Sequence, residues 1–202
     1  MRILVARDEA FNFIYRANVD ALGALGKVEF FSPLHDRALP ECDMLYLPGG
    51  YPELFIDVLA ANHGVAEEIR RYADGGGRIY AECGGFMYLC NDIDGARMCG
   101  VLPFKATMRN ARLHLGYRQM TLVDNADGGD VMLRGHEFHY SEVDDSRLEA
   151  VEKHCVQRSA RDAAVGTAIY RYKNVIAGYT HWYWAETGFH FFDGRWQFAA
   201  YR

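Results

Sequence analysis

One cysteine stands in a local pattern that is typical of a nucleophile. The run Arg78-Ile-Tyr-Ala-Glu-Cys83-Gly-Gly-Phe-Met-Tyr-Leu89 passes from an apolar strand pattern through small residues into an apolar helix pattern. Such a strand–nucleophile–helix turn requires small neighbours, which here are Ala81, Gly84 and Gly85. The turn would place the Cys83 sulfur at a helix N-terminus, which favours the thiolate, and would aim the Gly84 N–H at an oxyanion. The alternative is a buried cysteine beside a packing diglycine.

A second chemically rich segment is Arg134-Gly-His-Glu-Phe-His-Tyr-Ser141. Strand alternation places Glu137 and His139 on one face and His136 on the other. Two histidines three residues apart suit one face of a helix but not of a strand, so we predict no metal site here. We favour a strand whose polar face lines a substrate pocket or contacts a partner, with Glu137 and His139 as second-choice site residues.

An alternation of strands and helices must position the Cys83 turn. Apolar runs and helical spacing over the first 90 residues predict strands at 2–6, 28–31, 43–47 and 78–81 and helices at about 11–25, 53–72 and 86–90. This order is typical of an α/β fold with a parallel sheet. The later part predicts strands at 116–123, 131–141, 168–171 and 175–179, some of them antiparallel. We therefore predict a single α/β domain over residues 1–202, with a mostly parallel central sheet flanked by helices and a β-rich second half.

Composition excludes several classes of protein. Of 202 residues, 50% are hydrophobic and 24% charged, with 22 basic against 27 acidic side chains. This composition is that of a globular protein, and a net charge of −5 gives no electrostatic reason to bind nucleic acid. The apolar runs are too short to cross a membrane, and the charged N-terminus does not suit a signal peptide, so we expect a cytoplasmic protein. No P-loop is present, and the five cysteines show no zinc spacing.

Several segments together resemble the glutaminase domains of the cobyrinic acid a,c-diamide synthases, which are class I glutamine amidotransferases. They are Leu47-Pro-Gly-Gly-Tyr-Pro-Glu-Leu-Phe55, Tyr80-Ala-Glu-Cys-Gly-Gly-Phe-Met-Tyr-Leu89 and Arg134-Gly-His-Glu-Phe-His-Tyr-Ser141, with the opening Val5–Phe13 and Phe30–Leu34. They follow in the family's order from residue 1 to about 185. The resemblance implies a flavodoxin-like fold and hydrolysis of glutamine to ammonia.

The resemblance also implies roles for particular residues. The family nucleophile falls on Cys83, and its base falls on His181 in Gly178-Tyr-Thr-His181. The oxyanion and glutamine-binding glycines fall on Gly84 and Gly85 and on a second loop at Gly49-Gly50, which could otherwise be a mere turn. Arg134 is a second-choice cation for the glutamine carboxylate.

Two departures from the family pattern stand out. Most class I amidotransferases carry a glutamate two residues after the histidine to orient its ring, whereas this chain has Tyr183. The orienting group must therefore be another residue or be absent. The aromatic tail from Glu186 to Arg202 does not match the family.

The resulting hypothesis is a glutaminase that releases ammonia through a thioester on Cys83. By resemblance, ammonia would serve an ATP-dependent amidation of corrinoid or related tetrapyrrole carboxylates in cobalamin biosynthesis. We expect no cofactor in this chain, and ATP and magnesium on a partner synthetase domain or subunit. The alternatives are a PfpI-like cysteine hydrolase of the same fold and a catalytically silent module that binds a synthetase.

Overall fold

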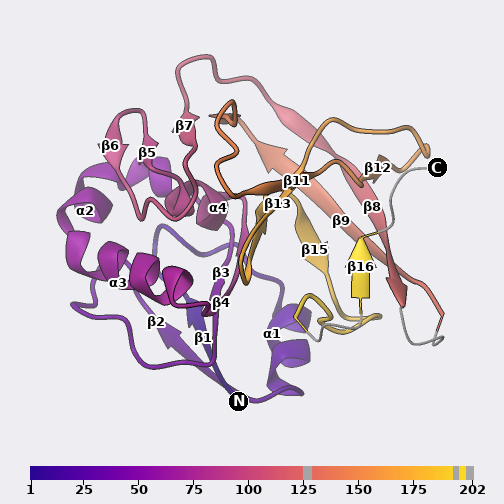
Figure 1. The fold of residues 1–202 in the computed structure, drawn as a ribbon, viewed down its shortest axis with the longest axis horizontal. Coiled ribbons are helices and arrows are strands. Elements are labelled where there is room, and N and C mark those ends of the chain that lie inside the picture. The colour runs from indigo at the N-terminus through magenta and orange to yellow at the C-terminus, as the bar shows by residue number, and fades with distance from the viewer. Residues whose placement is uncertain (125–128, 193–195, 199–202) are drawn as a thin grey trace.

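A seven-stranded sheet forms the centre of the molecule, which we describe from a computed structural model covering residues 1–124, 129–192 and 196–198 (Figure 1). Its spatial order is β11 (Glu152–His154), β13 (Ile169–Tyr172), β14 (Val175–Gly178), β4 (Arg78–Glu82), β3 (Met44–Leu47), β1 (Arg2–Ala6) and β2 (Lys27–Phe31). The strands from β14 to β2 pair in parallel, and β13 and β11 add antiparallel pairs at one edge. The predicted mostly parallel sheet is thus confirmed.

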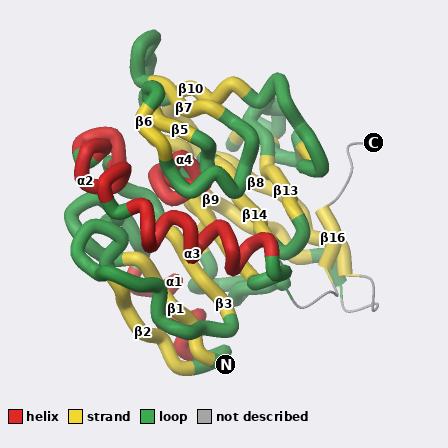
Figure 2. The backbone as a smooth tube through the Cα atoms, turned by 60° about the vertical axis from the view of Figure 1, so that its left-hand side comes forward, coloured by secondary structure: helices red, strands yellow, loops and turns green. Residues whose placement is uncertain are grey.

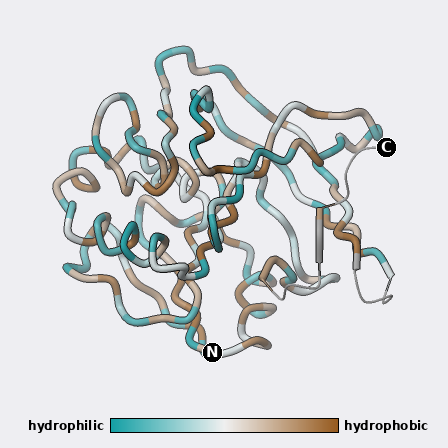
Figure 3. The backbone as a smooth tube through the Cα atoms, viewed as in Figure 1, coloured by the Kyte–Doolittle hydropathy of each residue, from teal (hydrophilic) through white to brown (hydrophobic). Residues whose placement is uncertain are grey.

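Helices cover one face of this sheet. They are α2 (Ile56–Ala61), α3 (His63–Asp74) and α4 (Gly84–Leu89), with the 3-10 helix η1 (Pro52–Leu54). In Figure 2, α3 lies in front of the central strands. Because side chains alternate along a strand, Leu45 and Leu47 of β3 and Ile79 and Ala81 of β4 all enter the core beneath these helices. Figure 3 shows hydrophobic residues concentrated along these central strands.

A second sheet and one helix cover the opposite face. The helix is α1 (Arg16–Gly23), and the sheet contains β12 (Arg158–Ser159), β8 (His114–Asp124), β9 (Val131–His139), β15 (His181–Tyr183) and β16 (Trp196–Phe198). The alternate side chains Met44, Tyr46 and Tyr80 pack here with Trp182 and Trp184. The described part of the aromatic tail belongs to this core, since Phe189 and Phe191 pack against Tyr80. The rest of the tail lies largely outside the described residues.

A small sheet follows the Cys83 turn. It has the order β10 (Glu142–Asp144), β7 (Lys105–Thr107), β5 (Asp92–Ile93) and β6 (Ala96–Arg97). With the long β8–β9 hairpin, it confirms that the second half is β-rich. In the described ranges, no helix has the length and apolarity that a membrane crossing requires.

The first helix is shorter than the sequence predicted. It begins at Arg16 rather than at Phe11, because Asp8 holds the preceding residues in a turn. The Asp8 Oδ1 atom accepts the N–H groups of Ala10 and Phe11, at 2.9 and 3.1 Å, and such a local bond competes with a helix. The chain then runs on to Phe13, whose N–H donates to the Gly49 carbonyl at 3.1 Å.

The predicted helix over 53–72 is also divided. Asn62 separates α2 from α3 with a non-helical backbone (φ −85°, ψ 47°). Its side-chain amide donates to the carbonyls of Pro33 and Asp36, at 2.8 and 2.9 Å. These bonds fasten the loop after β2 at the point where the two helices meet.

Candidate functional site

Three neighbouring strands deliver the candidate site to one edge of the central sheet. The Gly49-Gly50 loop follows β3, Cys83 follows β4, and His181 lies three residues after β14. Because β3, β4 and β14 are adjacent and parallel, their carboxyl ends meet at the same edge. This edge is where open α/β sheets bind ligands.

Cys83 occupies a strained turn. Its backbone has φ 46° and ψ −106°, a conformation that residues with a Cβ rarely adopt. Hydrogen bonds on both sides hold it, since the Cys83 N–H donates to the Gly178 carbonyl at 2.8 Å and the Cys83 carbonyl accepts the Met87 N–H at 3.0 Å. A non-glycine residue persists in such a conformation only when its surroundings enforce it, and such residues cluster at functional sites. The geometry matches the predicted strand–nucleophile–helix turn.

The glycines around Cys83 permit close backbone approach. A Cβ on Gly85 would overlap the Leu47 carbonyl, and a Cβ on Gly84 would lie 2.9 Å from the Gly50 oxygen. The Gly85 N–H is taken by the Pro48 carbonyl at 3.0 Å, so Gly85 packs the helix rather than facing a ligand. The Gly84 N–H is the first of α4 and therefore has no intrahelical acceptor. Of the elbow diglycine, Gly84 is thus the better oxyanion donor.

A cavity of about 210 Å³ opens at this edge. Its lining residues are Phe13, Gly50, Tyr51, Cys83, His136, Phe138 and His181. The structure thus brings together the predicted nucleophile, base and second glycine loop. Gly49 lies directly behind the base, since a Cβ on it would overlap Cε1 of His181.

His181 is buried between Cys83 and a carboxylate. It is 3% exposed, and its Nδ1 atom lies 3.7 Å from Oε2 of Glu82. Burial lowers the pKa of His181, but hydrogen bonding and charge interactions with Cys83 and Glu82 outweigh burial and raise it to about 10. The imidazole of this site is therefore held in its protonated form over the neutral pH range, which a thiolate–imidazolium pair requires.

Sequence reasoning missed three residues that shape the site, namely Glu82, His136 and Phe13. The His136 ring stacks on that of His181, with centroids 4.9 Å apart, and the Phe13 ring meets His181 edge-on at 4.6 Å. The Nδ1 atom of His136 is hydrogen-bonded to the Tyr15 hydroxyl at 2.8 Å. Burial, then the His181 charge, lower the pKa of His136, so it faces its neighbour as a neutral ring. Alternation had already separated His136 from Glu137, but only the packing shows which face turns to the cavity.

The second-choice residues do not line this cavity. The Glu137 carboxylate is buried and pairs with Arg118 at 2.6 Å, on the face of β9 that points away from Cys83. The His139 ring is stacked on Tyr179, with centroids 3.7 Å apart. Arg134 is exposed and lies 4.0 Å from Glu186. Pairing of β9 with β15 explains the places of Glu137 and His139, because His136 stands directly opposite His181 and the odd-numbered side chains of β9 face the other way. Arg134 shares the face of His136 but lies opposite Tyr183, one pair beyond the cavity.

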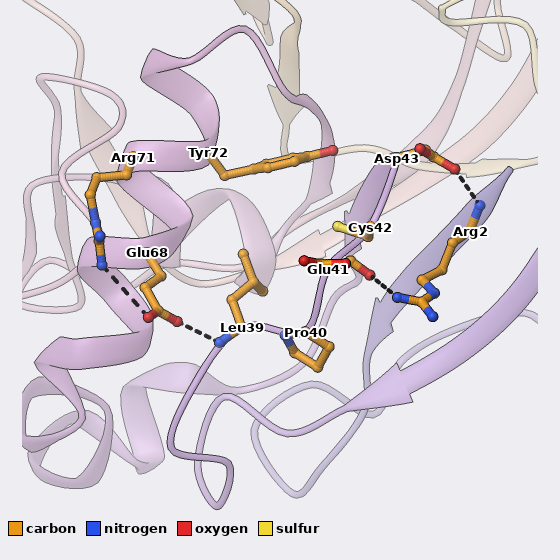
Figure 4. A pocket seen from close by; sticks show the side chains of 9 residues that line it. All are labelled: Arg2, Leu39, Pro40, Glu41, Cys42, Asp43, Glu68, Arg71 and Tyr72. Atoms are coloured by element: carbon orange, nitrogen blue, oxygen red, sulfur yellow. Dashed lines mark hydrogen bonds and ion pairs between the residues drawn. The ribbon is translucent and has the colours of Figure 1, made fainter.

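A larger hollow lies elsewhere. It measures about 730 Å³ and is lined by Arg2, Leu39, Pro40, Glu41, Cys42, Asp43, Glu68, Arg71 and Tyr72, as Figure 4 shows. Arg2 begins β1 and Asp43 precedes β3, so the hollow lies at the amino ends of the strands. Several of its polar groups pair with one another, as in the Leu39 N–H bond to Glu68 at 2.6 Å and the Arg2 N–H bond to Asp43 at 2.6 Å. We therefore place the candidate site at Cys83.

Metal ligands are not grouped in the part of the chain that the structure describes. No set of three or more His, Cys, Asp or Glu side chains there is arranged to hold a metal ion.

Comparison with solved structures shows the class of fold. A glutamine amidotransferase from Thermotoga maritima aligns with a TM-score of 0.57 at 16% identity, covering 89% of this chain and 75% of that one. A second glutamine amidotransferase aligns with a TM-score of 0.54 at 21% identity, covering 89% of each chain. The fold is that of the class I glutamine amidotransferases, as predicted.

Sequence comparison then shows the family. Residues 2–189 match the CobB/CobQ-like glutamine amidotransferase domain, and the chain belongs to this family. A cobyrinate a,c-diamide synthase from Fusobacterium nucleatum is 40% identical over 190 residues, which cover 89% of this chain and 40% of the relative. A hydrogenobyrinate a,c-diamide synthase from Pseudomonas aeruginosa is 40% identical over 189 residues, covering 91% of this chain and 41% of the relative. The chain thus spans about two-fifths of the length of these relatives.

Proposed function

We propose that this domain hydrolyses glutamine to glutamate and ammonia through a thioester on Cys83. The observation that carries the proposal is the cavity in which Cys83, in a strained turn, meets His181 beside the Gly50 loop. The Cys83 sulfur attacks the side-chain carbonyl carbon of glutamine, and the negative charge develops on the carbonyl oxygen. The N–H groups of Gly84 and Gly50 are the donors that we assign to that oxygen.

His181 carries the proton through the reaction. Paired with the Cys83 thiolate as an imidazolium, it gives its Nε2 proton to the leaving amide nitrogen, so that ammonia departs and the γ-glutamyl thioester remains. Water then attacks the thioester carbon, His181 removes a proton from this water, and the thiolate leaves with glutamate as product. The proton that His181 takes from water replaces the one it gave to ammonia, so the site ends as the same thiolate–imidazolium pair.

We further propose that the ammonia is used by an ATP-dependent synthetase domain to amidate corrinoid carboxylates. Support comes from the relatives, which are named cobyrinate and hydrogenobyrinate a,c-diamide synthases and are more than twice the length of the matched region. ATP and magnesium belong, in this proposal, to the synthetase domain. Free ammonia is largely protonated at neutral pH and unreactive, so the glutaminase cavity should face the synthetase.

The surface beside the cavity suits such a partner. Leu115 is 64% exposed and Tyr117 is 75% exposed on β8. They stand directly opposite Phe138 and His136, which line the cavity. Neighbouring apolar side chains exposed around a site mark a surface for a partner. We assign this surface, Leu115 and Tyr117 with Phe138, to the synthetase and call it the apolar rim.

The test is to treat the protein with a chloroketone analogue of glutamine, locate the label by mass spectrometry, and measure glutamate release with and without an added synthetase domain. We expect the label on Cys83, and a loss of glutamate release of at least about 10³-fold in Cys83→Ala. Cys155→Ala is the matched control, because this thiol is exposed and remote from the cavity. Hydrolysis at the wild-type rate in Cys83→Ala would contradict the proposal. Peptidase activity without glutaminase activity would indicate the PfpI-like hydrolase, and no hydrolysis under either condition would indicate a silent module.

A further inference from the structure

Glu82 stands beside the candidate base without a role in the mechanism above. It directly precedes Cys83, is 2% exposed, and points to the side of β4 opposite the helices. A carboxylate buried to this extent requires hydrogen-bond donors, because desolvation of an unpaired charge is costly. The positions of those donors show which carboxylate oxygen can accept a further hydrogen bond.

The two carboxylate oxygens are satisfied unequally. The Oε1 atom accepts two hydrogen bonds, from the Tyr80 hydroxyl at 2.8 Å and from the Trp182 N–H at 2.9 Å. The Oε2 atom accepts one, from the Tyr46 hydroxyl at 2.8 Å. Since a carboxylate oxygen has two lone pairs, Oε2 retains acceptor capacity. That oxygen is also the one that lies 3.7 Å from Nδ1 of His181.

The imidazole presents the complementary group. Nδ1 of His181 is buried and has no hydrogen-bond partner within 3.5 Å among the described residues. Nε2 lies on the opposite side of the ring and is left for Cys83, which interacts with this histidine through its side chain. Nδ1 of His181 and Oε2 of Glu82 thus lie 3.7 Å apart, slightly farther than a hydrogen bond. Catalytic hydrogen bonds are often long before substrate binds.

We infer that Glu82 is the positioning residue of the base: its Oε2 atom accepts the Nδ1 proton of His181, which fixes the ring with Nε2 toward Cys83 and stabilises the imidazolium. The proton on Nδ1 stays with His181 throughout, and only the Nε2 proton is exchanged with Cys83 and the leaving group. The inference deepens the proposed glutaminase function and rests on it for its catalytic consequence.

The surroundings keep Glu82 suited to this role. Burial, then the Glu82 charge, raise the pKa values of Tyr46 and Tyr80 well above 10, so both hydroxyls remain protonated donors. The bond to the Trp182 N–H ties the carboxylate to the backbone just after His181. Tyr183, at the position where an orienting glutamate would be expected, is instead 40% exposed and packs edge-on against Tyr15 at 5.2 Å. The orienting carboxylate therefore comes from the residue before the nucleophile.

The experiment compares Glu82→Gln with Tyr80→Phe. Glu82→Gln removes the charge with little change of shape, whereas Tyr80→Phe weakens the anchoring of Oε1 and leaves Oε2 beside His181. For Glu82→Gln we expect kcat for glutamate release to fall by about 10²–10⁴-fold, the range seen when a triad acid is lost, with little change in KM. For Tyr80→Phe we expect less than about a tenfold loss.

A titration of His181 by nitrogen-15 NMR provides a readout that needs no glutamine. Among the described residues, the ionisable groups that interact with His181 include Glu82, Cys83, His136 and His139, so the titration is recorded in the Glu82→Gln, Cys83→Ser, His136→Gln and His139→Gln variants. We expect the pKa of His181 to fall from about 10 toward 6.5 in Glu82→Gln and to stay raised in Tyr80→Phe. In wild type we expect Nδ1 to retain its proton when the ring becomes neutral.

The outcomes separate the two proposals. An unchanged His181 pKa in Glu82→Gln, or equal losses in Glu82→Gln and Tyr80→Phe, would overturn the role of Glu82. If Glu82→Gln does not fold, the wild-type spectrum decides, and loss of the Nδ1 proton before the Nε2 proton overturns the inference. Absence of glutamate release from the wild type, even with a synthetase domain, would refute the glutaminase function, while the titration would still decide the contact of Glu82 with His181.

Discussion

The candidate site requires glycine at two positions after β3, because a side chain at either would overlap a neighbouring group. The backbone of Gly49 lies against the imidazole, and that of Gly50 has φ 155°, with the Ala10 carbonyl where a Cβ would stand. Each glycine therefore leaves space that another group of the site occupies. Gly49 of this diglycine therefore positions His181, the proposed base, and Gly50 lines the cavity.

Gly49→Ala tests whether this close contact with His181 matters. The new Cβ would displace the imidazole, and a shift of about 1 Å in a reacting group costs on the order of 10²-fold in rate, so we expect kcat/KM for glutamine to fall by at least that factor. Gly64→Ala in α3 is the matched control, because its nearest neighbour would be 3.9 Å away. A Gly49→Ala enzyme within threefold of wild type would show that His181 does not need this close contact.

The β8–β9 hairpin is the element that closes the site. In β9, the even-numbered residues His136 and Phe138 face the cavity, and the odd-numbered residues Glu137 and His139 enter the protein. His139 lies between Tyr179 and His114, with ring centroids 3.7 and 4.7 Å away and nearly parallel planes. The polar side of the strand therefore fastens the hairpin to the domain, and the mixed aromatic side forms the cavity wall.

The pH dependence of stability tests this anchoring. Burial, aided by nearby positive charges, lowers the pKa of His139 to about 4, against about 6.5 in the unfolded chain. The unfolded state therefore binds a proton first, so this contribution is fully present above pH 6.5 and is lost as pH falls toward 4. Urea unfolding should show a decline over this range that is steeper in wild type than in His139→Gln, by on the order of a few kcal/mol.

An exposed histidine provides the control for that measurement. His63 lies at the exposed start of α3, so His63→Gln should leave the decline as in wild type. Equal slopes in His139→Gln and wild type would mean that this ring is not held in its neutral form by the fold.

The two faces of the central sheet differ in the side chains that they carry. The face beneath α2, α3 and α4 is a continuous apolar core. The other face, beneath α1 and the second sheet, also carries Glu82 among its aromatic residues. The cavity opens where this second layer meets the carboxyl ends of the strands. The apolar rim beside it is exposed on the same face of the β8–β9 hairpin as His136 and Phe138, where a synthetase domain could cover it.

Tyr117→Glu tests the rim. A charge at this exposed position should leave glutamate release by the domain alone within about threefold of wild type. In the presence of the synthetase domain, ATP, magnesium and a corrin acid, it should lower the amide formed per glutamine hydrolysed by about tenfold, since burying an unpaired charge in an interface is costly. Met132→Glu, also exposed but at the far end of β9, is the control. If Tyr117→Glu formed as much amide per glutamine hydrolysed as the wild type, the synthetase would have to contact another surface.

Much of this architecture was determined by the sequence itself. The strands β1 to β4 follow from short apolar runs, and the Cys83 turn follows from small residues between a strand pattern and a helix pattern, because these signals are local. The family resemblance of Gly178-Tyr-Thr-His181 pointed to His181, which lies with Cys83 in the lining of the cavity. Helical spacing failed at Phe11, where the neighbouring Asp8 carboxylate accepts backbone N–H groups in a turn, and at Asn62, whose side chain donates to carbonyls of a distant loop.

Only the tertiary structure decided which side chains complete the site. Alternation along β9 separates His136 from Glu137, yet either face could have turned toward Cys83 until β9 paired with β15 and set His136 opposite His181. The sequence likewise did not indicate that Glu82 contacts His181. The two residues are 99 positions apart and become neighbours only because β4 and β14 pair in parallel. Residue types and local periodicity are properties of short segments, whereas contacts of this kind arise from strand register, which many distant side chains determine together.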